Sequence, residues 1–168
     1  ADARDRVKVL AGDVAKGIDP IEARQNLRNG AVKSTNVTTF AQAAAAYIEA
    51  KVDLAEGGFK NAKHRQQWRN TLETYANPII GDVNVASVNT DDVLKVLQQD
   101  VLDKDGKVVG KLWNLKTETA SRLRGRIETV LSWAAFRDLR PKGDNPARWQ
   151  GHLSNELTAR SKVKKQEH

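Results

Sequence analysis

Residues 117–138, TETASRLRGRIETVLSWAAFRD, are the stretch that decides the fold class of this chain. Apolar side chains recur along it three and four residues apart, at Ala120, Leu123, Ile127, Val130, Leu131 and Ala134. This spacing places them on one side of an α-helix, and no proline interrupts the run. We therefore expect a long amphipathic helix from Thr117 to about Asp138, with these side chains in the core.

The segments before this helix carry helix signals of their own. Capping residues, apolar periodicity and terminating glycines predict helices from Thr39 to Gly57-Gly58, over residues 61–76, and from Asp91 to about Asp100. The second should end at Asn77-Pro78, because a residue before proline is pushed out of helical backbone. Two shorter helices are expected at 2–16 and 20–28, and the small, polar residues 31–38 are predicted to be a linker.

Residues 101–112 interrupt the helical pattern. Asp105-Gly106 stands between the apolar pairs Val101-Leu102 and Val108-Val109. An Asp-Gly pair between two apolar runs is typical of a β-hairpin turn. We therefore predict an all-α fold that carries one short two-stranded hairpin, followed after Pro141 by a helical turn within 147–157 and a charged tail.

Composition excludes several classes of protein. The chain of 168 residues is long enough to bury a core, and its apolar runs are far shorter than the roughly 18 residues of a membrane span. The absence of cysteine excludes a disulfide scaffold, a thiolate zinc site and a cysteine nucleophile. The three histidines are scattered, and glycine motifs for nucleotides are missing. We expect a cytoplasmic protein without metal, cofactor or small-molecule ligand.

Positive charge is concentrated on two helical segments. The chain has 28 Lys+Arg against 21 Asp+Glu, a formal net charge of +7. Residues 60–77 hold 4 basic residues and 1 acidic residue, and residues 117–168 hold 11 and 6. Such a distribution favours a polyanionic partner, and nucleic acid more readily than a membrane surface.

The long helix places a polar ridge opposite its apolar side. Thr119, Arg122 and Arg126 follow one another there at helical spacing. Such a ridge has the width and the donors to contact phosphates and base edges in the DNA major groove. A helix face that is simply solvated is the alternative interpretation.

The helix that begins near Asn61 carries a second polar surface, of lysines and amides. Helix N-termini donate backbone N–H groups to phosphates, and Asn or Gln can bind adenine with two hydrogen bonds. His64 has two equally good interpretations: it belongs to this surface, or its side chain packs or pairs locally. The DNA-binding residues that we expect on the two helices are Lys60, Asn61, Lys63, His64, Gln67, Asn70, Lys116, Thr119, Arg122 and Arg126.

Several short motifs recur in a consistent order along nearly the whole chain. They include GIDPIEAR at 17–24, KNAKH at 60–64, TLETYA at 71–76, ETASR at 118–122, RGRIE at 124–128 and NPARW at 145–149. In this order they resemble the prophage integrases of the P4-like group of tyrosine recombinases.

The resemblance implies a domain organisation and a function. Residues 1–38 would end an arm-binding domain and its linker, residues 39–157 would form a core-binding domain with a SAM-like helical bundle, and residues 158–168 would lead to a catalytic domain. Such a bundle forms half of a clamp around duplex DNA at the recombination core site, beside other integrase protomers. The catalytic tyrosine and its basic partners belong to the missing domain, so we expect no catalytic residue here. The alternative is a basic helical module that binds acidic protein partners.

Overall fold

The computed structural model describes residues 37–52, 58, 61–159 and 162–163. The predicted helices at 2–16 and 20–28 and the candidate residue Lys60 lie outside this part of the chain. The chain divides into two compact units, Ala1–Val37 and Thr38–His168, and the description below concerns the second. No helix within the described ranges is long and apolar enough to cross a membrane.

Helix α3, Phe40–Val52, begins where its capping residue predicts. The Gln42 amide donates to Thr39 Oγ1 at 3.3 Å, and the Thr39 amide donates to Gln42 Oε1 at 2.9 Å. Each side chain thus accepts the backbone N–H of the other residue, as in a capping box. The amide of Phe40 donates to the carbonyl of Val83 at 2.8 Å, which ties this end of the helix to a later loop. Four of the helix's buried side chains, Phe40, Ala44, Tyr47 and Ile48, are those of the predicted apolar side.

The next helix does not end at Asn77-Pro78, so that prediction is wrong. Helix α4, Ala62–Thr71, passes into a π-helical turn, η2 (Leu72–Ala76), and then into α5, Asn77–Ile80. The wider turn lets the Asn77 amide donate to the carbonyl of Leu72, five residues back. Pro78 then lies in the first turn of α5, where a missing N–H costs no helical hydrogen bond.

Helix α6, Thr90–Leu97, begins one residue earlier and ends three residues earlier than predicted. The side chain of Asn89 accepts the Asp92 amide at 3.0 Å, and that of Asp92 accepts the Asn89 amide at 3.2 Å, which closes a capping box. At its other end, the chain turns into strand β1 at Asp100. Extended backbone therefore replaces the expected last turn.

The predicted hairpin is confirmed. Strands β1, Asp100–Leu102, and β2, Val108–Lys111, pair antiparallel. In the loop, the Asp103 carboxylate accepts the amides of Asp105 and Lys107, each at 2.9 Å, and Gly106 has a φ of 76°. A left-handed φ is one that glycine adopts readily, which explains the Asp-Gly signal. The short helix α7, Leu112–Leu115, follows and was not predicted.

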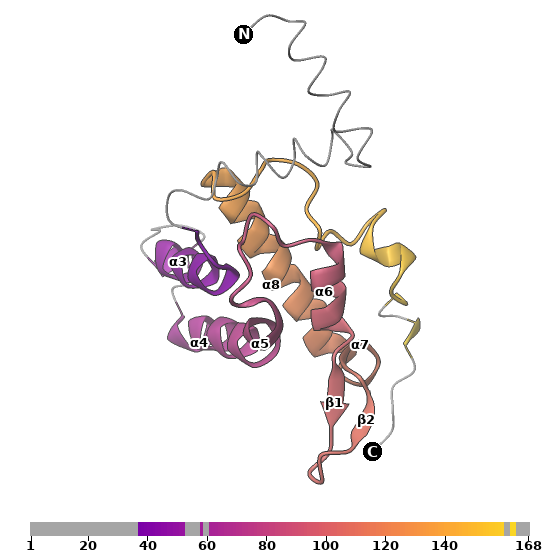
Figure 1. Ribbon diagram of the computed structural model, residues 1–168. Coiled ribbons are helices and arrows are strands. Elements are labelled where there is room, and N and C mark those ends of the chain that lie inside the picture. The colour runs from indigo at the N-terminus through magenta and orange to yellow at the C-terminus, as the bar shows by residue number, and fades with distance from the viewer. Residues whose placement is uncertain (1–36, 53–57, 59–60, 160–161, 164–168) are drawn as a thin grey trace, which may run out of the picture. The chain divides into compact units, whose positions relative to one another are not determined.

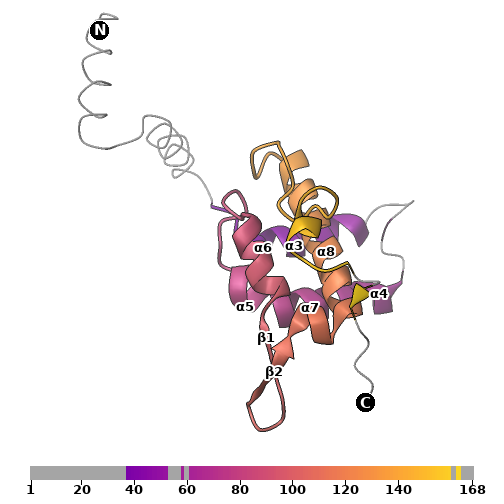
Figure 2. The same cartoon turned by 90° about the vertical axis from the view of Figure 1, so that its right-hand side faces the viewer.

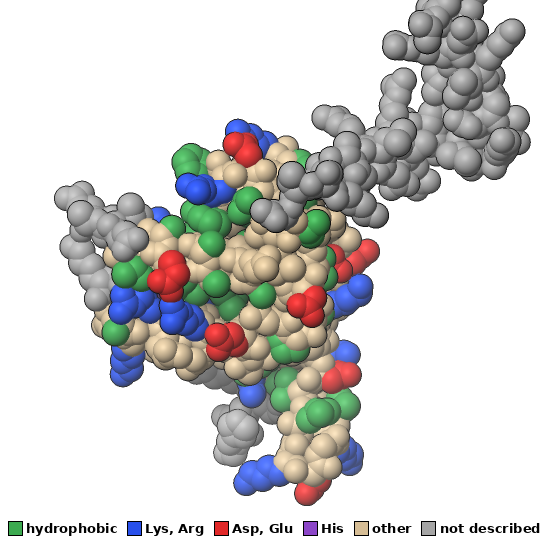
Figure 3. Space-filling view, turned by 60° about the vertical axis from the view of Figure 1, so that its left-hand side comes forward, with side chains coloured by type: hydrophobic (Ala, Val, Ile, Leu, Met, Phe, Trp, Pro, Cys, Tyr) green, Lys and Arg blue, Asp and Glu red, His purple; other side chains and the backbone are tan. Residues whose placement is uncertain are grey.

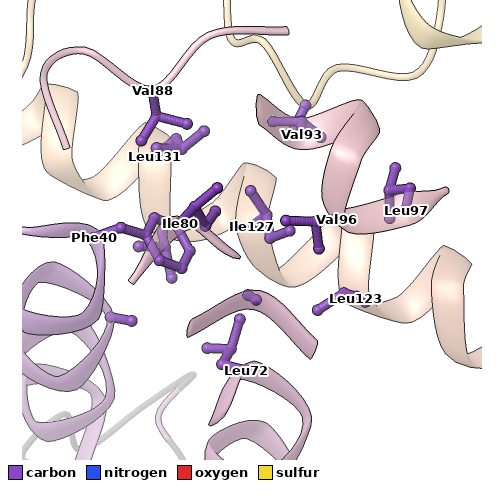
Figure 4. Close-up of a cluster of buried hydrophobic side chains, with 14 of the residues drawn as sticks. Phe40, Leu72, Ile80, Val88, Val93, Val96, Leu97, Leu123, Ile127 and Leu131 are labelled. Carbon is purple, nitrogen blue, oxygen red and sulfur yellow. The ribbon is translucent and has the colours of Figure 1, made fainter. Parts of the chain in front are cut away.

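Helix α8, Thr117–Phe136, is the long helix that the sequence predicts. It crosses the middle of the bundle and packs against α3, η2, α6 and α7 (Figure 1). Its buried residues are the six of the apolar spacing: Ala120, Leu123, Ile127, Val130, Leu131 and Ala134. Side chains from α3, η2, α5 and α6 surround them to form the core (Figure 4). All-α architecture with one hairpin is therefore the observed fold.

The chain after α8 folds back along the bundle (Figure 2). Asn145 Nδ2 donates to the Glu128 carbonyl and to Ser132 Oγ, both at 2.8 Å. The ring of Trp149 stacks on Trp113 with 5.4 Å between centroids. The helical turn predicted within 147–157 is shorter than expected, a 3-10 turn, η3, at Leu153–Asn155.

Candidate nucleic-acid interface

Helix α4 presents nearly all of its surface to solvent. It contains no buried residue and no acidic side chain. Lys63, Gln67 and Asn70, which the sequence places on the DNA-binding surface, are all exposed. Lys and Arg side chains gather on the side of the bundle where α3 and α4 come forward (Figure 3). This helix therefore combines positive charge with amide donors and acceptors on one accessible face.

Asn61 is the N-cap of α4. Its Oδ1 accepts the Lys63 amide at 2.8 Å, and its backbone is extended at φ −94° and ψ 116°. The side-chain NH₂ is not part of the cap and remains a donor. Asn61 thus shapes the helix end as well as lying on the expected DNA-binding surface.

Two pairs of side chains on α4 hydrogen-bond to each other within the helix. Trp68 Nε1 lies 3.3 Å from His64 Nε2, to which it donates, so His64 pairs within its own helix. Gln66 Nε2 donates to Asn70 Oδ1 at 2.6 Å, again one turn apart. The second pair leaves the side-chain oxygen of Gln66, Oε1, as an acceptor and the side-chain nitrogen of Asn70, Nδ2, as a donor at the helix surface.

The amino-terminal half of α8 holds the second group of expected residues. Lys116 is exposed and its carbonyl accepts the Ala120 amide at 2.9 Å, while Thr119 is half-buried. Arg122 is exposed and pairs with Glu118, whose Oε1 lies 2.9 Å from both Nε and Nη2. Sequence reasoning missed this pair, although a Glu four residues before an Arg is a readable helix signal.

Arg126 is not a free member of the ridge, which corrects the sequence interpretation. Its Nη1 donates to the Gln67 carbonyl at 2.7 Å and to Thr71 Oγ1, and its guanidinium lies 5.4 Å from the Trp68 ring centroid. Burial, together with the positive charge of Arg122, lowers the pKa of Arg126 below its ordinary value. At about 100° per residue, Arg126 lies only about 40° around the helix from buried Val130 and about 60° from buried Leu123. It is therefore at the edge of the apolar side and not opposite it, and α4 contacts this edge of α8.

Of the expected residues, the structure brings Gln67 and Arg126 into direct contact. A hollow of about 300 Å³ lies elsewhere, near the carboxyl end of α8, with Leu131, Phe136 and Arg140 among its lining residues. Within the described ranges there is no group of three His, Cys, Asp or Glu residues that could hold a metal ion. The polar, positive surface of α4 and α8 is therefore the candidate site.

One comparison with known proteins identifies a family. The profile of the phage integrase central domain matches residues 40–152, which is more than half of the chain. The solution NMR structure of protein Nmul_A0922 from Nitrosospira multiformis is 47% identical in sequence, with a TM-score of 0.54. That match covers 68% of this chain and 92% of that chain. None of the curated proteins matches. The chain belongs to the family of phage integrase central domains.

Proposed function

We propose that this domain binds duplex DNA at the core site of recombination, as part of a prophage tyrosine recombinase. Family membership implies DNA binding in site-specific recombination. The observation that carries the proposal further is α4, a helix with no buried residue, with cationic and amide side chains and no acid. Helices of this kind fit the major groove, where phosphates bind cations and base edges bind amides.

Eight of the ten expected residues have a proposed contact with DNA in this complex. Lys63, Lys116 and Arg122 neutralise phosphates, as would Lys60, which lies outside the described part of the chain. Gln67 and Asn70 face base edges, because amides pair with the N6 and N7 atoms of adenine. Asn61 and Thr119 donate to the backbone of the duplex at the two helix N-termini. Other integrase protomers would bind the same DNA.

Strand cleavage is assigned to another domain of the recombinase. A nucleophilic tyrosine must reach a phosphate and be surrounded by cationic groups. Tyr47 is buried in the bundle and burial raises its pKa, which opposes ionisation of its hydroxyl. Tyr75 is half-buried and packs against the core. Neither tyrosine is therefore proposed to attack DNA.

Binding to duplex DNA should weaken steeply as salt rises. If roughly 4 to 6 phosphates are neutralised, a plot of log K against log salt concentration should have a slope of about −3 to −6. Titration of a labelled core-site duplex at several salt concentrations, read by fluorescence anisotropy, measures this slope. A basic protein-interaction module would give a flat response and no binding at low salt, and that result would contradict the proposal.

Glu118→Gln should strengthen DNA binding by about 2- to 5-fold. The substitution removes a negative charge beside the proposed phosphate contacts and releases Arg122 from an exposed pair, whose contribution is about 0.2 to 1 kcal/mol. Anisotropy titrations against the parent protein at physiological salt check the change.

Asp138→Asn is the matched control for Glu118→Gln. It removes one exposed carboxylate beyond the other end of α8, which pairs with Lys142 at 3.2 Å. Twenty helical residues span about 30 Å, several Debye lengths at physiological salt. Asparagine also tolerates the φ of 56° found at this position. Binding should change by less than about 1.5-fold, and equal gains in both variants would show a general charge effect instead of a local one.

A further inference from the structure

Little apolar burial holds helix α4 in the bundle. The helix has no buried residue, and only Arg65, Trp68 and Thr71 in it are half-buried. Helices in proteins are stabilised chiefly by packing of an apolar side, which α4 largely lacks. Its placement must therefore depend on a few specific contacts.

Aromatic contact provides one attachment, on the side of α3. The Trp68 ring lies 5.4 Å from the ring of Tyr47, and the Tyr47 ring lies 6.0 Å from that of Trp133 on α8. Arg69 also pairs with Glu49 on α3, but both side chains are exposed. Exposed pairs contribute little, because solvent screens them.

Arg126 provides the attachment to α8. Its hydrogen bonds reach the Gln67 carbonyl and the Thr71 hydroxyl, which lie one turn apart on α4, and its guanidinium lies over Trp68 between them. Hydrogen bonds from a charged donor are about twice as strong as neutral ones. Both hydrogen bonds leave the same atom, Nη1, while the planar guanidinium lies over the Trp68 ring, a planar contact that a lysine ammonium lacks.

The contacts of Arg126 also lie just before a change of helix type. Thr71 is the last residue of α4, and the π-helical turn begins at Leu72. Leu72 is 2% exposed and anchors the following turn in the core, so α4 extends from a fixed point. Arg126 therefore contacts α4 close to the point where the helix joins the core, and burial in the core contributes little to the position of α4.

We propose that Arg126 is a positioning residue, which holds α4 against α8 and so sets the spacing of the two DNA-binding helices. This inference rests on the proposed function of those helices. It assigns Arg126 a role inside the protein in place of a contact with phosphate. It also predicts that α4 loosens when Arg126 is lost, while the core around α8 stays folded.

The test compares Arg126→Gln with Arg122→Gln in the full 168-residue chain. The two arginines lie one turn apart on α8 and undergo the same change, but Arg122 is exposed and pairs with Glu118 on its own helix. Hydrogen exchange measured by NMR reports the opening of α4 and of α8 separately. Titration of a core-site duplex across salt concentrations reports the number of phosphates neutralised.

In Arg126→Gln we expect α4 amides to exchange at least about 10-fold faster, with α8 core amides changed less than about 3-fold. DNA affinity should fall by about 10-fold, with the salt slope changed by less than about 0.3. In Arg122→Gln, exchange in α4 should stay at the parent rate and the salt slope should become shallower by about 0.9, the loss of one phosphate contact. Arg126→Lys keeps the charge but should still speed exchange in α4, because the planar contact of the guanidinium with the Trp68 ring is lost.

Each contrary outcome has a distinct meaning. Unchanged α4 exchange in Arg126→Gln, with a slope shallower by about 0.9, would make Arg126 a phosphate contact and overturn the proposal. Loss of protection in α8 in step with α4 would also overturn it, because α4 would then belong to the cooperative core. If the parent protein shows no salt-dependent DNA binding, the proposed function fails, but the exchange result still decides whether Arg126 positions α4.

Discussion

Ile127→Ala should lower the free energy of unfolding by about 2 to 5 kcal/mol. Ile127 is 0% exposed and lies at the middle of α8, where side chains from α6 and η2 surround it (Figure 4). Truncation removes apolar burial and leaves a cavity that a close-packed core closes only in part. Urea denaturation followed by circular dichroism, with the slope m held common, measures the change.

Two companion variants make the Ile127 result specific. Ile127→Val removes one methylene and should cost about 0.5 to 1.5 kcal/mol, so the loss should grow with the volume removed. Arg122→Ala changes an exposed residue of the same helix and should cost less than about 0.5 kcal/mol. Equal effects of Ile127→Ala and Arg122→Ala would show that the buried side of α8 is wrongly assigned.

Trp113→Ala should destabilise the domain by about 3 to 5 kcal/mol and loosen the segment after α8. The Trp113 side chain is 3% exposed, its Nε1 donates to the Thr158 carbonyl at 2.9 Å, and its ring stacks on Trp149. Trp113 on the short helix α7 thus contacts the segment after α8 at two residues, Trp149 and Thr158. Urea denaturation gives the stability, and limited proteolysis detects new cleavage within residues 145–158.

Two aromatic controls separate burial from the hydrogen bond. Trp113→Phe keeps much of the apolar surface and loses the N–H donor, so it should cost clearly less than the alanine variant. Phe136→Ala removes a ring that is 77% exposed and should change stability by less than about 0.5 kcal/mol. If Trp113→Ala leaves stability and the proteolytic pattern unchanged, the segment is not anchored by this indole.

Much of the fold follows from local sequence signals. The spacing of apolar residues in 117–138 predicts all six buried side chains of α8, because helical geometry alone determines which residues share a side. Thr39 and Asn89 mark helix starts, since their side chains accept backbone amides that the helix leaves unpaired. The Asp-Gly pair predicts the hairpin because glycine permits the left-handed turn.

Other features depend on contacts that no local signal contains. Pro78 predicts a helix end, but the helical segment continues to Ile80 because a π-helical turn precedes the proline. That turn places Leu72 and Ala76 in the core, so burial of both favours the change of helix type. The ion pair of Glu118 and Arg122 lies between these two cases. The four-residue spacing in the sequence is typical of such a pair, but the pair was not predicted.

The candidate interface shows the same division. By itself, the sequence determined that α4 carries cations and amides, that α8 carries cations, and which side of α8 is apolar. Only the tertiary structure decided that Arg122 stays exposed while Arg126 is covered by α4, where it bonds to Gln67 and Thr71. The physical reason is that periodicity sets the angle of a residue around its own helix, whereas exposure depends on which other helix packs against that side.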